Sequence, residues 1–191
     1  MRILKYSNSF YNSFDLRQIA KPILKKICKE TELTTFLTVW HNGRSVCIDS
    51  MTLSRNVNTH LFVEIGKEIP LHCAALAKVL LVYQSTEDIK RIINEEPLLR
   101  YTSNTIIEPE KLMIHLLAIK NKGYAICNEE LEEVIKAIVA PVKNINRETI
   151  ASISITGLSK RMSLNNINKF TDILINSAGE ISKKIGYEKF I

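Results

Sequence analysis

Residues 34–50 read TTFLTVWHNGRSVCIDS, two strand-like runs on either side of a turn signal. Thr34–Trp40 and Ser45–Ser50 are rich in β-branched and aromatic residues, which favour strands. Between them lies His41-Asn42-Gly43-Arg44, and the Asn-Gly pair tolerates the positive φ angles of a tight turn. The stretch therefore predicts an antiparallel β-hairpin.

On the N-terminal side of the hairpin, the apolar spacing predicts a helix that starts at Asp15. Apolar residues recur there at spacings of three and four, at Leu16, Ile19, Ile23 and Ile27. Asp15 is a suitable N-cap, and Pro22 predicts a kink or a later start. Residues 1–14 show no clear period, so we expect a linker remnant or the end of a longer helix.

On the C-terminal side, strands and helices follow in separate groups. Val57–Ile65 predicts a third strand, and residues 72–83 are strong helix formers. Two further helices are expected: one from the cap at Ser85 to Asn94, and one from Pro109 to Gly123. After them we expect strands at 124–127, 135–142 and 150–156, a turn at 144–148, and a helix over 164–185.

This order of elements predicts an α+β fold with a mostly antiparallel sheet of about six strands and helices packed on it. It argues against a doubly wound nucleotide-binding sheet. The six glycines are isolated, so the sequence contains no glycine-rich phosphate loop.

Composition sets further limits on function. The chain has 191 residues and a net charge of +6, enough for one domain with a full core. Four separated cysteines and four scattered histidines predict neither a metal site nor a cofactor, and the cysteines are expected to be reduced and packed. No apolar run is long enough to cross a membrane and no signal peptide is visible, so we expect a cytoplasmic protein. The lysines of the first helix are interpreted as a solvated face.

Several motifs, in a constant order, resemble the effector-binding domain of IclR-family transcriptional regulators. The first motif runs from Gly66 through Pro70-Leu71-His72 to Ala77-Lys78 and the apolar residues after it. The others are a Thr-x-x-Thr loop at Thr102–Thr105, Gly123-Tyr124 followed by Glu129-Glu130, and two strand-like runs, Ile138–Val142 and Ala151–Gly157. The resemblance covers residues 15–186. It implies a GAF/profilin-like sheet, a domain over residues 15–191, and a preceding linker at 1–14.

The resemblance also implies partners. Members of the family pair as dimers and often as tetramers, and they bind DNA through a winged helix-turn-helix. We see none before Asp15, so we expect contact with DNA only through a domain absent from this sequence. The alternative is a stand-alone GAF-like ligand-binding module. No motif places a nucleophile and base or paired carboxylates, so we do not expect an enzyme, and Glu129, Glu130, Glu132 and Glu133 are interpreted as solvated.

The family's site accepts a small organic acid or a related metabolite, between the sheet and the start of the helix after Pro-Leu-His. The matching backbone donors are Ala75 and Leu76, because first-turn N–H groups suit a carboxylate. The matching hydroxyls are Ser154 and Thr156, which share one strand face.

Four positions depart from the family pattern. Cys127 stands where an acid is common and Ala137 where a polar or thiol residue often lies, while Ala75 and Val134 each replace a common glycine. Fewer polar partners predict a larger or less hydroxylated ligand than glyoxylate or pyruvate, or a degenerate pocket. Cys127 and Cys73 could face the pocket as a thiol sensor, although packing is the simpler interpretation. His72 is interpreted as packed.

Overall fold

A single antiparallel sheet forms the centre of the molecule. The computed structural model describes residues 3–53, 63–95 and 97–187, with backbone alone for 3–14. The six strands lie in the order β3-β2-β1-β6-β5-β4, and their bounds are β1 Thr34–His41, β2 Arg44–Met51, β3 Glu68–Ile69, β4 Ala125–Asn128, β5 Ile135–Lys143 and β6 Thr149–Leu158. The α+β class and the six-stranded antiparallel sheet predicted from the sequence are therefore confirmed.

The predicted hairpin is present and its turn has two residues. His41 pairs with Arg44, and Asn42 and Gly43 have φ angles of 50° and 80°. Strand β1 then pairs with β6, so the first and last strands of the described residues meet at the sheet centre.

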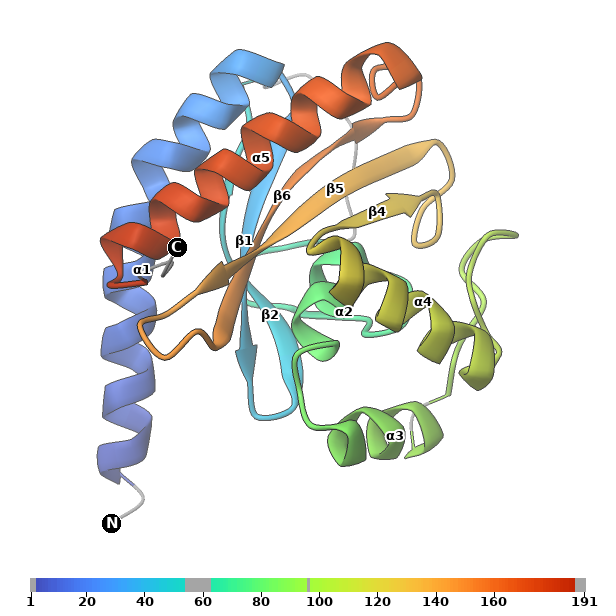
Figure 1. Cartoon of the computed structure of the whole chain (residues 1–191), viewed down its shortest axis with the longest axis horizontal. Helices are drawn as coiled ribbons and strands as arrows, with labels where there is room; N and C mark the ends of the chain where they lie inside the picture. The colour runs from blue at the N-terminus through green and yellow to red at the C-terminus, as the bar shows by residue number, and fades with distance from the viewer. Residues whose placement is uncertain (1–2, 54–62, 96, 188–191) are drawn as a thin grey trace.

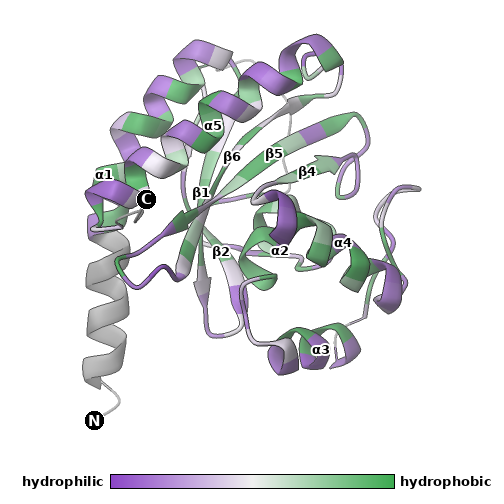
Figure 2. Ribbon diagram, viewed as in Figure 1, coloured by the Kyte–Doolittle hydropathy of each residue, from purple (hydrophilic) through white to green (hydrophobic). Residues whose placement is uncertain are grey.

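Helices cover both faces of the sheet (Figure 1). One face carries α1 (Ile3–Thr31) and α5 (Leu164–Lys184), and the other carries α2 (Ala75–Leu81). Beyond α2 lie α3 (Thr86–Glu95) and α4 (Pro109–Lys122). In Figure 2, α2 is largely hydrophobic, whereas α1 and α5 alternate between hydrophobic and hydrophilic bands, as expected for helices with one solvated face.

The sheet separates two apolar cores. Adjacent residues of one strand point to opposite faces, so Ile138 packs in the core beneath α1 and α5 while Val139 packs in the core around α2 and α4. Residues 151–156 of β6 are all buried. The alternation of isoleucine with small or polar residues over 150–156 predicts a half-buried strand, and this prediction is wrong because helices cover the strand from both sides.

Two other expectations need correction. Helix α1 begins at Ile3 and continues through Pro22, so Asp15 is an exposed residue inside the helix and not its cap. The predicted strand Val57–Ile65 falls mainly outside the described residues, and 63–65 are not a strand; the third strand is the two-residue β3. The predicted starts of α3 and α4 and the left-handed Gly123 at the end of α4 are confirmed.

Candidate functional site

A small cavity lies between the start of α2 and strands β4, β5 and β6. It has a volume of about 40 Å³ and is lined by Val63, Ala74, Ala75, Leu76, Cys127, Leu131, Glu132, Ile135, Ala137 and Thr156. Five of the six residues selected from the sequence are in this lining. The sixth, Ser154, lies behind it.

The start of α2 forms one wall of the cavity. The amides of Ala77 and Lys78 both donate to the Ala74 carbonyl oxygen, at 3.1 and 3.0 Å, and Ala74 provides no side-chain cap. The N–H groups of Ala75 and Leu76 therefore occupy the first turn, where a helix has no acceptor of its own. Both residues line the cavity.

The opposite wall is a row of three residues across three strands. Cys127 of β4 pairs with Ala137 of β5, and Ala137 pairs with Thr156 of β6. Because paired residues in adjacent strands share a face, the three side chains lie side by side. The strand register thus brings together positions that are up to 29 residues apart in the sequence (156 − 127).

Three hydroxyls on β6 have different roles. The Ser152 hydroxyl donates to the Leu76 carbonyl oxygen at 3.0 Å and also contacts the Thr38 hydroxyl at 2.5 Å, which fixes α2 against the sheet. The Ser154 hydroxyl is fully buried and lies 3.2 Å from the Thr156 hydroxyl. Only the third hydroxyl, that of Thr156, lines the cavity.

The two thiols near the cavity are held in their protonated form. The Cys127 thiol donates to the Cys73 carbonyl oxygen at 3.5 Å. Burial raises the pKa of both thiols, that of Cys73 to about 12 even though the Lys78 ammonium opposes the shift. A thiolate is the reactive species, so these cysteines behave as packed residues. This is the interpretation favoured from the sequence.

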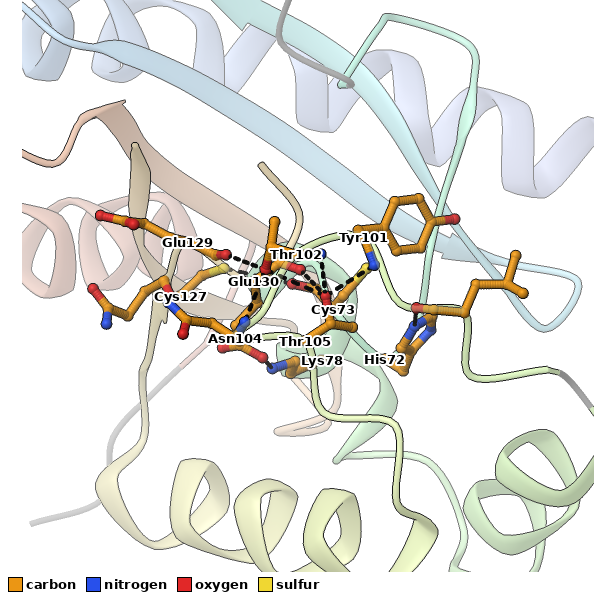
Figure 3. A network of polar contacts seen from close by, with 12 residues as sticks. His72, Cys73, Lys78, Tyr101, Thr102, Asn104, Thr105, Cys127, Glu129 and Glu130 are labelled. Atoms are coloured by element: carbon orange, nitrogen blue, oxygen red, sulfur yellow. Dashed lines mark hydrogen bonds and ion pairs between the residues drawn. The ribbon is translucent and has the colours of Figure 1, made fainter. Parts of the chain in front are cut away.

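A buried ion pair was missed by sequence reasoning. Lys78 of α2 and Glu130, in the segment after β4, form an ion pair with side chains 1% and 7% exposed (Figure 3). Burial raises the pKa of Glu130, and the Lys78 charge opposes that shift. The expectation that Glu130 is solvated is wrong. The pair neutralises the Lys78 charge internally, so that charge is not available to a bound anion.

The Thr-x-x-Thr loop and His72 lie outside the cavity. The Thr102 hydroxyl donates to the Glu129 carbonyl oxygen at 2.6 Å and the Thr105 hydroxyl to that of Glu130 at 2.7 Å (Figure 3). His72 is buried, with its Nε2 2.8 Å from the Leu99 carbonyl oxygen and its ring against Tyr101. His72 is therefore buried and hydrogen-bonded, and it does not line the cavity at the start of α2.

Sequence reasoning also missed part of the lining. Val63, Ala74, Leu131, Glu132 and Ile135 complete the cavity. Leu131 and Glu132 lie in the segment between β4 and β5, Val63 lies before β3, and a single sequence gives no signal that these segments meet at the start of α2. Within the described residues, no three His, Cys, Asp or Glu side chains gather where they could hold a metal ion, and no helix is long and apolar enough to cross a bilayer.

Comparison with known proteins gives a consistent result. Residues 9–183 match the family described as "Bacterial transcriptional regulator IclR C-terminal". The HTH-type transcriptional regulator KipR of Bacillus subtilis is 30% identical over 184 residues, covering 96% of this chain and 73% of KipR.

Solved structures share the fold. The IclR of Thermotoga maritima superposes with a TM-score of 0.85 at 28% identity, covering 97% of this chain and 74% of that one. An IclR homologue from Microbacterium hydrocarbonoxydans, crystallised with 4-hydroxybenzoate, gives a TM-score of 0.82 at 20% identity, covering 97% and 74%. With the fold and these matches in agreement, the chain belongs to the IclR family of bacterial transcriptional regulators and corresponds to their C-terminal domain.

Proposed function

We propose that this domain binds a small organic acid in the cavity at the start of α2, and that binding controls a transcriptional regulator. One observation carries the proposal: the first turn of α2, at Ala75 and Leu76, and the row Cys127, Ala137 and Thr156 line the same cavity. The regulators to which the chain is similar support the second part. Contact with DNA would be made by a winged helix-turn-helix domain of the same regulator.

The lining favours a monoacid with an apolar body. Most of the lining residues are aliphatic, and Thr156 and Glu132 provide its polar side chains. No Lys, Arg or His is among the described lining residues, and the Lys78 charge is already paired with Glu130. A second carboxylate on the ligand would lack a partner and would meet the Glu132 carboxylate, and a buried unmatched polar group costs about 1–3 kcal/mol.

Ligand size supports the same choice and adds a requirement. Sites for small molecules typically enclose roughly 300–1,000 Å³, whereas this cavity has about 40 Å³. A bound acid must therefore displace part of the wall. The aromatic acid bound by the Microbacterium homologue is of the size that would need such a displacement.

Calorimetry with a panel of acids tests the proposal. We expect benzoate or 4-hydroxybenzoate to bind at least tenfold more tightly than glyoxylate or succinate. Thr156→Val should raise the Kd of the preferred acid by about tenfold, since a hydrogen bond to a charged group contributes about 1.5–3 kcal/mol. Thr171→Val, a matched change in α5 on the other sheet face, should leave binding unchanged. Tight glyoxylate binding, or full affinity in Thr156→Val, would contradict the proposal.

The remaining expectations belong to the same proposal. The curated relatives are transcriptional regulators and not enzymes, so we expect every acid in the panel to be recovered unchanged after prolonged incubation, as measured by NMR. We also propose self-association as a dimer or tetramer, to be measured by light scattering, no membrane partner, and a cytoplasmic location.

A further inference from the structure

The Lys78–Glu130 pair is unusual among the ion pairs of this domain. In the described part of the chain, every other ion pair has at least one well-exposed side chain. Taking two charges out of water is costly, and two packed apolar residues often serve stability equally well. Stability alone therefore does not explain why two charged residues are buried at this position.

Each partner of the pair adjoins a wall of the cavity. Lys78 follows Leu76 by two residues on α2, and Glu130 directly precedes Leu131 and Glu132. The ion pair thus ties the helix wall to the segment that forms the outer wall. Leu131 and Glu132 of this segment, residues 129–134, line the cavity, so an outward shift of the segment would enlarge it for a larger acid.

The same segment is held from outside by the turn at residues 101–105. Besides the bonds from Thr102 and Thr105, the Asn104 side-chain amide donates to the Asn128 carbonyl oxygen at 3.1 Å. Three consecutive carbonyls, 128 to 130, are therefore bonded by one turn (Figure 3). On the side of β6, the Ser159 hydroxyl donates to the Glu129 carboxylate at 2.5 Å.

The backbone of segment 129–134 is strained at both ends, so these contacts hold it in an unfavourable conformation. Its two ends, Glu129 and Val134, have φ angles of 60° and 58°. This left-handed region is unfavourable for residues with a side chain, above all for β-branched ones. Such strain persists only where surrounding contacts impose it.

We propose that Lys78 and Glu130 are positioning residues that hold segment 129–134 closed over the cavity and thereby set how fast a bound effector leaves. The inference rests on the proposed function, since it requires that the effector enters this cavity. The pair and the 101–105 turn fix the segment as one unit, and release of the pair frees the wall without unfolding the sheet.

Hydrogen–deuterium exchange of the free protein provides the first test. The double variant Lys78→Met/Glu130→Met keeps the site apolar and leaves no unpaired buried charge. We expect at least tenfold faster exchange at the amides of Glu129 and Ser159, which donate to the Ile135 and Val134 carbonyl oxygens. The amides of β1 and α5 should be unchanged. The control, Lys184→Met/Glu180→Met, removes an exposed pair on α5 and should leave segment 129–134 as it is.

Dissociation of 4-hydroxybenzoate provides the second test. The dissociation rate should rise at least tenfold in the double variant while Tm stays within a few degrees of the parent. Glu130→Gln would leave the Lys78 ammonium buried without its counter-charge, so the double variant, and not this single change, is the one compared with the parent.

Two results would overturn the inference: unchanged exchange in 129–134, or uniformly faster exchange with a large fall in Tm, which would make the pair merely structural. Because exchange is measured without ligand, a failure of all acids to bind would defeat the proposed function separately.

Discussion

At the scale of single residues, the strained backbone of Val134 gives a direct prediction. A left-handed conformation costs a residue with a Cβ about 1–2 kcal/mol, and glycine adopts it freely at an entropic cost of about 0.5–1 kcal/mol. Val134 is 60% exposed, so its side chain contributes little burial. We expect Val134→Gly to raise the free energy of unfolding by up to about 1 kcal/mol, measured by urea denaturation. Val134→Ala keeps the Cβ and should gain less than Val134→Gly; equal effects of the two changes would count against strain at this position.

His115 gives a pH-dependent prediction at the same scale. Burial, with help from the Lys78 and Lys122 charges, lowers the pKa of His115 from 6.5 to about 4. Between pH 6.5 and about pH 4, His115 is protonated in the unfolded chain but neutral in the folded chain, so lowering the pH through this range favours unfolding. We expect Tm to fall less between pH 7 and pH 4.5 in His115→Gln than in the parent, while His41→Gln, at an exposed position, keeps the parental fall. An equal fall in His115→Gln would refute the assignment.

Among the helices and strands, the sequence predicted those features that depend on residues close together in the chain. The Asn42-Gly43 turn, the Ser85 cap of α3 and the Gly123 end of α4 each depend on a few neighbouring residues. The row from Cys127 to Thr156 could be predicted only through the family resemblance. The Lys78–Glu130 pair could not be predicted, because its partners are 52 residues apart and Glu130 stands among acids that look alike in sequence.

The attachment of α2 to the sheet can be tested through Ser152. Its hydroxyl joins the Leu76 carbonyl oxygen to the Thr38 hydroxyl in a fully buried place. Ser152→Ala leaves those groups short of a partner, so the free energy of unfolding should fall by about 1–3 kcal/mol, as measured by urea denaturation. Ser103→Ala, at an exposed position, should stay within about 0.5 kcal/mol of the parent. A Ser152→Ala protein as stable as the parent would show that α2 is held by apolar packing alone.

At the scale of the whole molecule, the sheet couples two cores that share no residue. In strand β1, Phe36 packs in the core around α2 and Leu37 packs in the core beneath α1 and α5. Loss of either core exposes one face of the same strands, and a sheet with one bare apolar face is not stable in water. We therefore expect the cavity side and the α1 side to unfold as one unit.

Denaturation of variants in the two cores tests this coupling. Leu24→Ala in α1 and Leu116→Ala in α4 each truncate a side chain with at most 1% exposure, and each should cost about 2–5 kcal/mol. If the domain unfolds as one unit, Trp40 fluorescence and far-ultraviolet circular dichroism will give one coincident transition in both variants. The two costs should also add to within about 0.5 kcal/mol in the double variant, because the sites lie on opposite faces of the sheet. Separate transitions for the two cores would mean that α1 can loosen while the cavity stays intact, and a signal could then not pass through the sheet as a single body.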